Sequence, residues 1–233
     1  MPQNEALSPS QATNRSTREA LEQLRREIDA LDDQMLALVE KRVTAAMGIA
    51  ELKRSDGDGR LRLRPAREAA VVERLVSQAK ASPERLVRGI WREIMSACLD
   101  LQVHTELALH AGVQPAVLVD ATRRRFGGAA EMVVVSSPTE ALTAARLREA
   151  VAVIELEPGS SWWTALRDDP VLAIFDCLRD EQGRVLGLAI GRIAAEDLTS
   201  CPQIRVADAT DAAGETLASA GNLRLILAAP GAA

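Results

Sequence analysis

The sequence predicts a multidomain protein, in which an N-terminal all-α unit of three helices is followed by a C-terminal α/β domain. Two observations predict this organisation. From residue 18 to residue 54, apolar residues recur at steps of three and four, which is the spacing of an amphipathic helix. After His104, short apolar runs alternate with helical patterns, as in a layered α/β domain. We therefore divide the chain into a disordered polar tail (1–15), an all-helical domain (16–104) and an α/β domain (105–233).

The long first helix is the element around which the chain is organised. Ser16 and Glu19 stand three residues apart just before its apolar stripe, as in a capping box, and no proline interrupts the run that follows. About 37 residues with a rise of about 1.5 Å each give a helix of roughly 55 Å. Because this exceeds the width of a small domain, we expect the helix to pack against a partner. The stripe consists of Leu21, Leu24, Ile28, Leu31, Met35, Leu38, Ala46 and Ile49.

Two shorter helices complete the all-helical domain. A glycine-containing turn at residues 56–59 ends the first helix, and Pro65 suits the first position of the second helix, which we expect to stop near Ala81. Ser82 and Pro83 then resemble a cap and a first-turn proline for a third helix that runs to about Val103.

The second half of the chain alternates strands and helices. A helix is expected over 138–149, with Ser137 as its cap and Glu140 three residues on. Further helices are expected over 116–125 and over 208–219, the latter ending at Gly221. The expected strands are 107–109, 132–135, 151–156, 171–175, 185–190 and 223–227.

Composition excludes several classes of function. Only 2% of the residues are aromatic and the net charge is −5, so neither base stacking nor phosphate-backbone binding to a nucleic acid is expected. Three scattered cysteines favour a reducing, cytoplasmic location over a disulfide framework. We find no signal peptide, no apolar run long enough to span a membrane and no ligand spacing for a metal.

The cations on the long helix are the first candidates for chemistry. Arg42 and Lys53 are eleven residues apart, so they share a helix face about 16 Å apart, and their side chains leave a gap that fits a small dianion. Arg25 lies about 25 Å from Arg42 on another azimuth, so it can join the same site only from an antiparallel partner helix. The alternative is that these residues are ordinary solvated charges on a helix flank.

Five ordered blocks with matching spacing resemble the AroQ class of chorismate mutases, over residues 18–103. The resemblance is closest to the mutase half of bifunctional chorismate mutase–prephenate dehydratases. The blocks are Leu-Arg-Arg-Glu-Ile-Asp-Ala-Leu-Asp at 24–32, Glu-Lys-Arg at 40–42, 49–53, Arg-Pro-Ala-Arg-Glu at 64–68, and Arg-Glu-Ile-Met-Ser-Ala-Cys-Leu at 92–99 with Gln102.

This resemblance implies an intertwined all-helical homodimer with two active sites, each built from both chains. It places Arg42 and the partner chain's Arg25 on the two carboxylates of chorismate. It places Lys53 and Gln102 on the ether oxygen of the breaking bond. Arg67 and Glu68 would lie near the substrate hydroxyl, with Glu68 as a hydrogen-bond acceptor. All six residues are therefore candidate substrate-binding residues, and the catalytic ones are Lys53, Gln102, Arg42 and Arg25.

The sequence departs from this family at three places. There are two extra residues between Lys53 and Arg67, Arg64 stands where some members have Asp, and Cys98 stands where some have Ser. We therefore carry over no role for Arg64 or Cys98.

The implied reaction agrees with these residue types. The rearrangement of chorismate to prephenate is pericyclic, so it needs no nucleophile, proton transfer, metal or cofactor. Two arginines would clamp the dianion in a near-attack shape, while Lys53 and Gln102 would oppose the negative charge that grows on the ether oxygen. Because residue 102 is a glutamine, we expect activity that does not require acidic pH.

The second half faintly resembles the first lobe of prephenate dehydratase, through Arg125-Phe126-Gly127, 133–139 and 151–159. The catalytic signatures of that enzyme are absent, and only some 28 residues separate the last two expected motif positions, too few for a second lobe. We therefore interpret residues 105–233 as a degenerate, non-catalytic domain. The alternative is an unrelated structural or partner-binding α/β domain.

Together these observations predict a cytoplasmic chorismate mutase of phenylalanine and tyrosine biosynthesis, active as a homodimer without cofactor, nucleic acid or membrane. Two alternatives stay open. One is an isochorismate pyruvate-lyase, which uses the same helical fold. The other is a catalytically silent regulatory protein that binds a ligand or partner through its α/β half.

Overall fold

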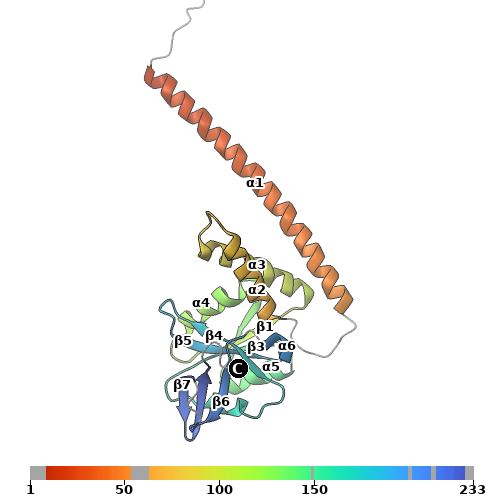
Figure 1. The fold of residues 1–233 in the computed structure, drawn as a ribbon, viewed down its shortest axis with the longest axis vertical. Coiled ribbons are helices and arrows are strands. Elements are labelled where there is room, and N and C mark those ends of the chain that lie inside the picture. The colour runs from red at the N-terminus through yellow and green to blue at the C-terminus, as the bar shows by residue number, and fades with distance from the viewer. Residues whose placement is uncertain (1–8, 54–62, 148–149, 199–200, 211–213, 229–233) are drawn as a thin grey trace, which may run out of the picture. The chain divides into compact units, whose positions relative to one another are not determined.

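The computed structural model describes residues 9–53, 63–147, 150–198, 201–210 and 214–228 (Figure 1). The chain forms two compact units, Met1–Gly48 and Ile49–Ala233. The first unit holds almost all of one long helix, and the second holds the other described helices and all of the described strands.

Helix α1 (Pro9–Lys53) has 45 residues, which corresponds to about 68 Å. It begins at Pro9, so the prediction of a start at Ser16 is wrong, and residues 9–15 belong to the helix and not to a tail. Proline is common in the first turn of a helix, so Pro9 suits this start. No proline or glycine then follows until Gly48. Residues 1–8 and the turn predicted at 56–59 lie outside the described residues.

The apolar stripe predicted for α1 is present and exposed. The side chains of Leu24, Ile28, Leu31, Met35 and Leu38 are each more than half exposed. A contiguous apolar face of this kind marks an interaction surface in soluble proteins.

Helices α2 (Pro65–Gln78) and α3 (Glu84–Gln102) pack against each other at the start of the second unit. Pro65 opens α2 as predicted. Ser82 does not cap α3; Pro83 occupies the N-cap position with extended backbone. An ion pair of 2.7 Å between Arg88 of α3 and Glu73 of α2 joins the two helices.

A five-stranded mixed sheet forms the centre of the second unit, with strand order β2-β1-β3-β5-β4. Strand β1 pairs in parallel with β2 and β3, whereas β5 pairs antiparallel with β3 and β4. Most of the strands predicted after His104 are thereby confirmed, although the fourth begins two residues later than expected. The strands are β1 (Glu106–His110), β2 (Glu131–Val134), β3 (Ala150–Glu155), β4 (Ala173–Arg179) and β5 (Val185–Gly191).

The two faces of this sheet carry separate hydrophobic cores. Helix α4 (Pro115–Phe126) covers one face, together with Leu99 of α3. Helix α5 (Pro138–Leu147) and the 3-10 helix η2 (Trp162–Leu166) cover the other face (Figure 1). The predicted cap of α5 is confirmed, since the Ser137 hydroxyl accepts the backbone N–H of Glu140 at 3.2 Å.

A second, three-stranded antiparallel sheet follows the short helix α6 (Ala195–Leu198) and has the order β6-β8-β7. Its strands are β6 (Ile204–Asp208), β7 (Glu215–Ala220) and β8 (Leu223–Leu227). The helix predicted over 208–219 is therefore wrong. Gly221, with φ of +59°, and Asn222 form a two-residue hairpin loop between β7 and β8. A Gly-Asn pair between apolar runs is a hairpin signal, and the structure uses Gly221 in this way and not as a helix end.

Within the described ranges, no helix is both long enough and apolar enough to cross a lipid bilayer.

Candidate functional site

Three of the six candidate residues lie on α1. Arg25 is exposed and donates a hydrogen bond to Glu22 at 2.8 Å, while Arg42 is half-buried. The helix is unbroken between these two arginines, so their seventeen-residue separation corresponds to about 25 Å. Lys53 is the last residue of α1, and its side chain lies outside the described residues.

The other three candidates lie on α2 and α3. Arg67 is exposed in the first turn of α2, and Gln102 is the half-buried last residue of α3. Glu68 follows Arg67 and is half-buried, and it lines a cavity that neither Arg67 nor Gln102 reaches. Of these three candidates, Glu68 alone is among the residues that line this cavity.

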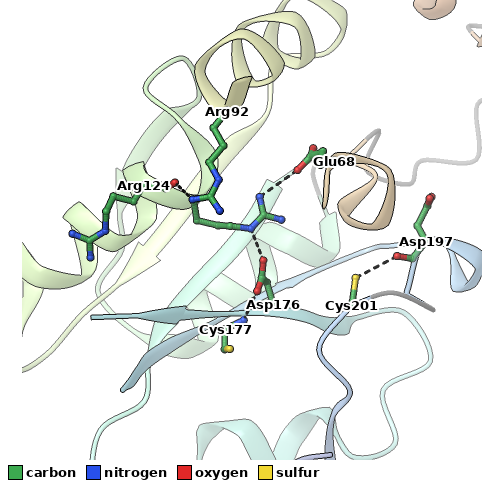
Figure 2. A network of polar contacts seen from close by, with 8 residues as sticks. Glu68, Arg92, Arg124, Asp176, Cys177, Asp197 and Cys201 are labelled. Atoms are coloured by element: carbon green, nitrogen blue, oxygen red, sulfur yellow. Dashed lines mark hydrogen bonds and ion pairs between the residues drawn. The ribbon is translucent and has the colours of Figure 1, made fainter. Parts of the chain in front are cut away.

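Glu68 forms an ion pair with an arginine of the α/β layer. Arg125, at the end of α4, donates from Nη1 to Glu68 at 3.2 Å and from Nε to Asp176 of β4. Figure 2 shows Glu68 and Asp176 pointing into the same space from α2 and from the sheet. Burial of Arg125 disfavours its charge, but the carboxylates of Asp176 and Glu68 outweigh this effect and raise its pKa. The bridge therefore joins α2 to the α/β layer.

The cavity beside this bridge has a volume of about 470 Å³ and lies between α2, α3, α4 and β4. Arginines dominate its polar lining, and three carboxylates accompany them. The arginines are Arg88, Arg92, Arg124, Arg125 and Arg179, and the carboxylates are Glu68, Glu73 and Asp176. Sequence reasoning missed this cavity. The run Arg123–Arg125 at the end of a predicted helix was a visible signal, but the two carboxylate partners of Arg125 are more than fifty residues away.

At the other end of α4 a carboxylate of the chain itself occupies the helix N-terminus. Glu155, at the end of β3, is buried and accepts the backbone N–H groups of Val113 at 2.9 Å and Gln114 at 3.0 Å. The strand order reverses between β1 and β3, and α/β sheets commonly bind ligands outside the carboxyl ends of the strands at such a point. Here Glu155 satisfies the amides that an anionic ligand would use.

Two cysteines line the cavity, and neither is suited to be a nucleophile. Burial raises the pKa of Cys177 above its usual value, and burial together with Asp176 raises the pKa of Cys201 to about 11. Both thiols are therefore protonated at neutral pH. No cluster of three or more His, Cys, Asp or Glu side chains that could hold a metal occurs in the part of the chain that the structure describes.

Comparison with known proteins finds similarity in the helical part. Residues 24–103 match the family model of chorismate mutase type II. A bifunctional chorismate mutase/prephenate dehydratase of Neisseria gonorrhoeae is 36% identical over 107 residues, which cover 46% of this chain and 28% of that protein. A bifunctional chorismate mutase/prephenate dehydratase of Aquifex aeolicus is 34% identical over 95 residues, which cover 39% of this chain and 26% of that protein. No solved structure is a significant match.

The chain thus spans little more than a quarter of the length of the curated relatives it matches. The segment matched by the family model contains every one of the six candidate residues. Residues 24–103 of this chain are therefore similar to the chorismate mutase type II family.

Proposed function

We propose that the helical part of this chain, residues 16–104, catalyses the rearrangement of chorismate to prephenate. The observation that carries this proposal is the chorismate mutase type II match over residues 24–103, which includes Arg25, Arg42, Lys53 and Gln102. The relatives that share this segment are named bifunctional chorismate mutase/prephenate dehydratases. We accordingly assign the reaction to phenylalanine and tyrosine biosynthesis in the cytoplasm.

The proposed mechanism is electrostatic clamping without covalent or acid–base catalysis. Arg42 of one chain and Arg25 of the partner hold the two carboxylates and keep the substrate compact. Lys53 and Gln102 donate hydrogen bonds to the ether oxygen, where negative charge grows as the bond to carbon lengthens. Because these contacts are stronger in the transition state than in the ground state, they lower the barrier.

Two features of α1 support the proposal of a homodimer with shared sites. Its apolar stripe is exposed along the helix. Arg25 is about 25 Å from Arg42 on the same helix, too far for one small substrate to contact both. An antiparallel second copy of α1 both covers the stripe and brings its Arg25 to Arg42.

We propose no catalysis for residues 105–233. Support comes from Glu155, whose buried carboxylate accepts the amides at the start of α4, where the α/β layer could otherwise bind an anion. The proposed role of this half is structural: it holds α2 and α3 through the bridge from Arg125 to Glu68.

The direct test follows the disappearance of chorismate and identifies the product with the full chain, using chorismate and isochorismate in parallel. Prephenate from chorismate supports the proposal, whereas pyruvate from isochorismate alone indicates a pyruvate-lyase. Turnover of neither substrate indicates a catalytically silent protein. Phenylpyruvate formed from prephenate would refute a non-catalytic second half.

Variants of α1 test the roles of individual residues. Arg42→Gln should lower kcat/KM on the order of 100-fold, because it removes a charged contact to the reacting dianion. Lys41→Gln is the matched control, since Lys41 is an exposed neighbour without a proposed role.

Mixed dimers of Arg25→Ala and Lys53→Ala chains should regain activity, because each heterodimer contains one intact site. A confirmed heterodimer without activity would contradict shared sites.

A further inference from the structure

The face of α2 that carries Glu68 is turned toward the α/β layer. Pro65 and Val72 lie three residues before and four residues after Glu68, and both are buried. Leu63, just before the helix, belongs to the same hydrophobic core as α4. Residues at these spacings share one side of a helix, whereas Arg67 is exposed about 100° around it. The neighbouring candidates Arg67 and Glu68 therefore have different environments.

Glu68 is held on this side by a guanidinium that is itself fixed. Its Oε2 accepts from Nη1 of Arg125 at 3.2 Å, and Nε of the same guanidinium donates to Asp176. The guanidinium carbon of Arg125 also lies 4.9 Å from the centre of the Phe126 ring. The side chains of Arg125, Asp176 and Glu68 are only 18%, 19% and 22% exposed. Such partly buried pairs are screened by salt and water less than surface pairs are.

Substrate binding needs the same carboxylate in another place. Resting on the proposed function, Glu68 is the acceptor that the resemblance places at the substrate hydroxyl, together with Arg67. Neither Arg67 nor Gln102 lines the cavity into which Glu68 points. A glutamate side chain has several staggered rotamers, so Glu68 can leave Arg125 while α2 stays in place. The substrate and Arg125 thus compete for one carboxylate.

From this geometry we propose that Arg125 masks Glu68, and that the contact is an autoinhibitory device by which the α/β half weakens substrate binding at the mutase helices. When a binding-competent state is only a fraction of the population, the apparent affinity is reduced by that fraction. The chemical step follows after Glu68 has moved to the substrate. The contact with Arg125 therefore raises KM and leaves kcat unchanged.

Steady-state kinetics of the full chain with chorismate test this mask. Arg125→Gln removes the cation that holds Glu68, so KM should fall several-fold at an unchanged kcat. A substitution that merely loosened the fold would lower the active fraction, and with it kcat, without lowering KM. Arg123→Gln is the matched control and should leave KM unchanged, because Arg123 is an exposed arginine of the same helix turn that does not line the cavity.

Asp176→Asn should have the opposite effect. It leaves Glu68 as the ion-pair partner of Arg125 among the described residues. Removing Glu68 as well would then leave a buried charge unpaired, so the mask becomes stronger and KM should rise several-fold. General loosening of the packing would move both variants in the same direction. Where circular dichroism shows that Arg125→Gln does not fold, Asp176→Asn decides, and a KM that is unchanged or lowered overturns the proposal.

A double-mutant cycle separates the contact from the proposed function. The effects of Glu68→Gln and Arg125→Gln on urea denaturation should be non-additive, because the two side chains touch, and this result does not depend on turnover. Additive effects would overturn the mask. Turnover with the same KM in Arg125→Gln and Arg123→Gln would also overturn it and leave the proposed function intact.

The absence of chorismate turnover from the unmodified chain and from Arg125→Gln alike would refute the proposed function and the mask together. Turnover that is absent from the unmodified chain and present in Arg125→Gln would support both.

Discussion

Helix α1 and the five-stranded sheet place similar apolar residues in opposite environments. Leu24 and Leu31 of α1 are each 56% exposed, whereas Leu109 of β1 and Leu188 of β5 are fully buried. The apolar residues of the helix recur at steps of three to four, whereas those of the strands form continuous runs, because both faces of the sheet are covered. An apolar pattern is therefore as clear in an element that the chain leaves exposed as in elements that it buries.

The difference shows where each part obtains its stability. The sheet buries its apolar residues against α4 on one face and against α5 and η2 on the other, so its core is complete within one chain. An isolated helix gains little from its own hydrogen bonds in water, and most helical stability comes from packing of the apolar face. We therefore expect α1 to gain stability by association and the sheet to be independent of it.

The largest expected effect comes from the same substitution placed in the two regions. Leu109→Ala should lower the free energy of unfolding of the α/β layer by about 2–5 kcal/mol, because it leaves a cavity in a closed core. Leu31→Ala should change that free energy by less than about 0.5 kcal/mol, because Leu31 is exposed. Urea denaturation followed by tryptophan fluorescence measures both, since Trp163 is fully buried in the α/β layer.

Equal destabilisation by the two variants would contradict this comparison. It would mean that the stripe of α1 contributes to the same cooperative unit as the sheet.

A second prediction concerns association through α1. Leu31→Glu places a charge in the apolar stripe, and burying a leucine contributes about 1.5–3 kcal/mol, so the variant should shift a dimer toward monomer. Ala37→Glu adds the same charge on the opposite face of the helix and should leave the dimer intact. Analytical ultracentrifugation over a range of concentrations measures the shift. If both variants have the mass of the unmodified protein, α1 does not form the interface.

A third prediction, with a smaller expected effect, concerns the polar groups at the end of β3 and the start of α4. Glu155→Gln keeps one acceptor for the amides of Val113 and Gln114 but removes the negative charge at the start of α4. A carboxylate at a helix N-terminus contributes up to about 1–2 kcal/mol when it is partly buried, so unfolding should be easier by about that amount. Glu157→Gln is a neighbouring control, with chemical denaturation as the measurement. A more stable Glu155→Gln variant would indicate that the carboxylate is held there at a cost, as in a ligand site.

Much of this fold could be predicted from local signals. Pro65 at the start of α2 and the Ser137 cap of α5 act within one turn of helix, so single residues are sufficient to identify them. The hairpin of β7 and β8 was also local, because the loop needs the positive φ of Gly221, but the preceding residues 208–219 were assigned a helical period. That error was a choice between two periods and not a missing signal.

The contacts of the candidate site could not be predicted in the same way. Glu68 was identified by the resemblance, yet its partner Arg125 is 57 residues away and reaches it only because α4 packs on the sheet. The packing that joins α2, α3 and α4 depends on the whole core, which no single motif specifies. The lowered pKa of Arg92 likewise results from burial and from neighbouring charges, which only the folded structure reveals.

The smallest expected effect concerns an exposed link between α3 and the sheet. His104 lies between Asp100 of α3 at 3.2 Å and Glu131 of β2 at 3.0 Å, and the contact with Glu131 raises its pKa. A raised folded pKa means that protonated His104 stabilises the fold below its unfolded value of about 6.5, and that this contribution is lost as the pH rises through the raised pKa. His104→Gln should therefore lower the melting temperature more at about pH 5.5 than at about pH 9. His110→Gln is the matched control for the loss of an imidazole, because its ring contacts the backbone carbonyl of Val135. Should the effect of His104→Gln be independent of pH, the two carboxylates contribute nothing through the charge of His104, and the link between α3 and β2 is then packing alone.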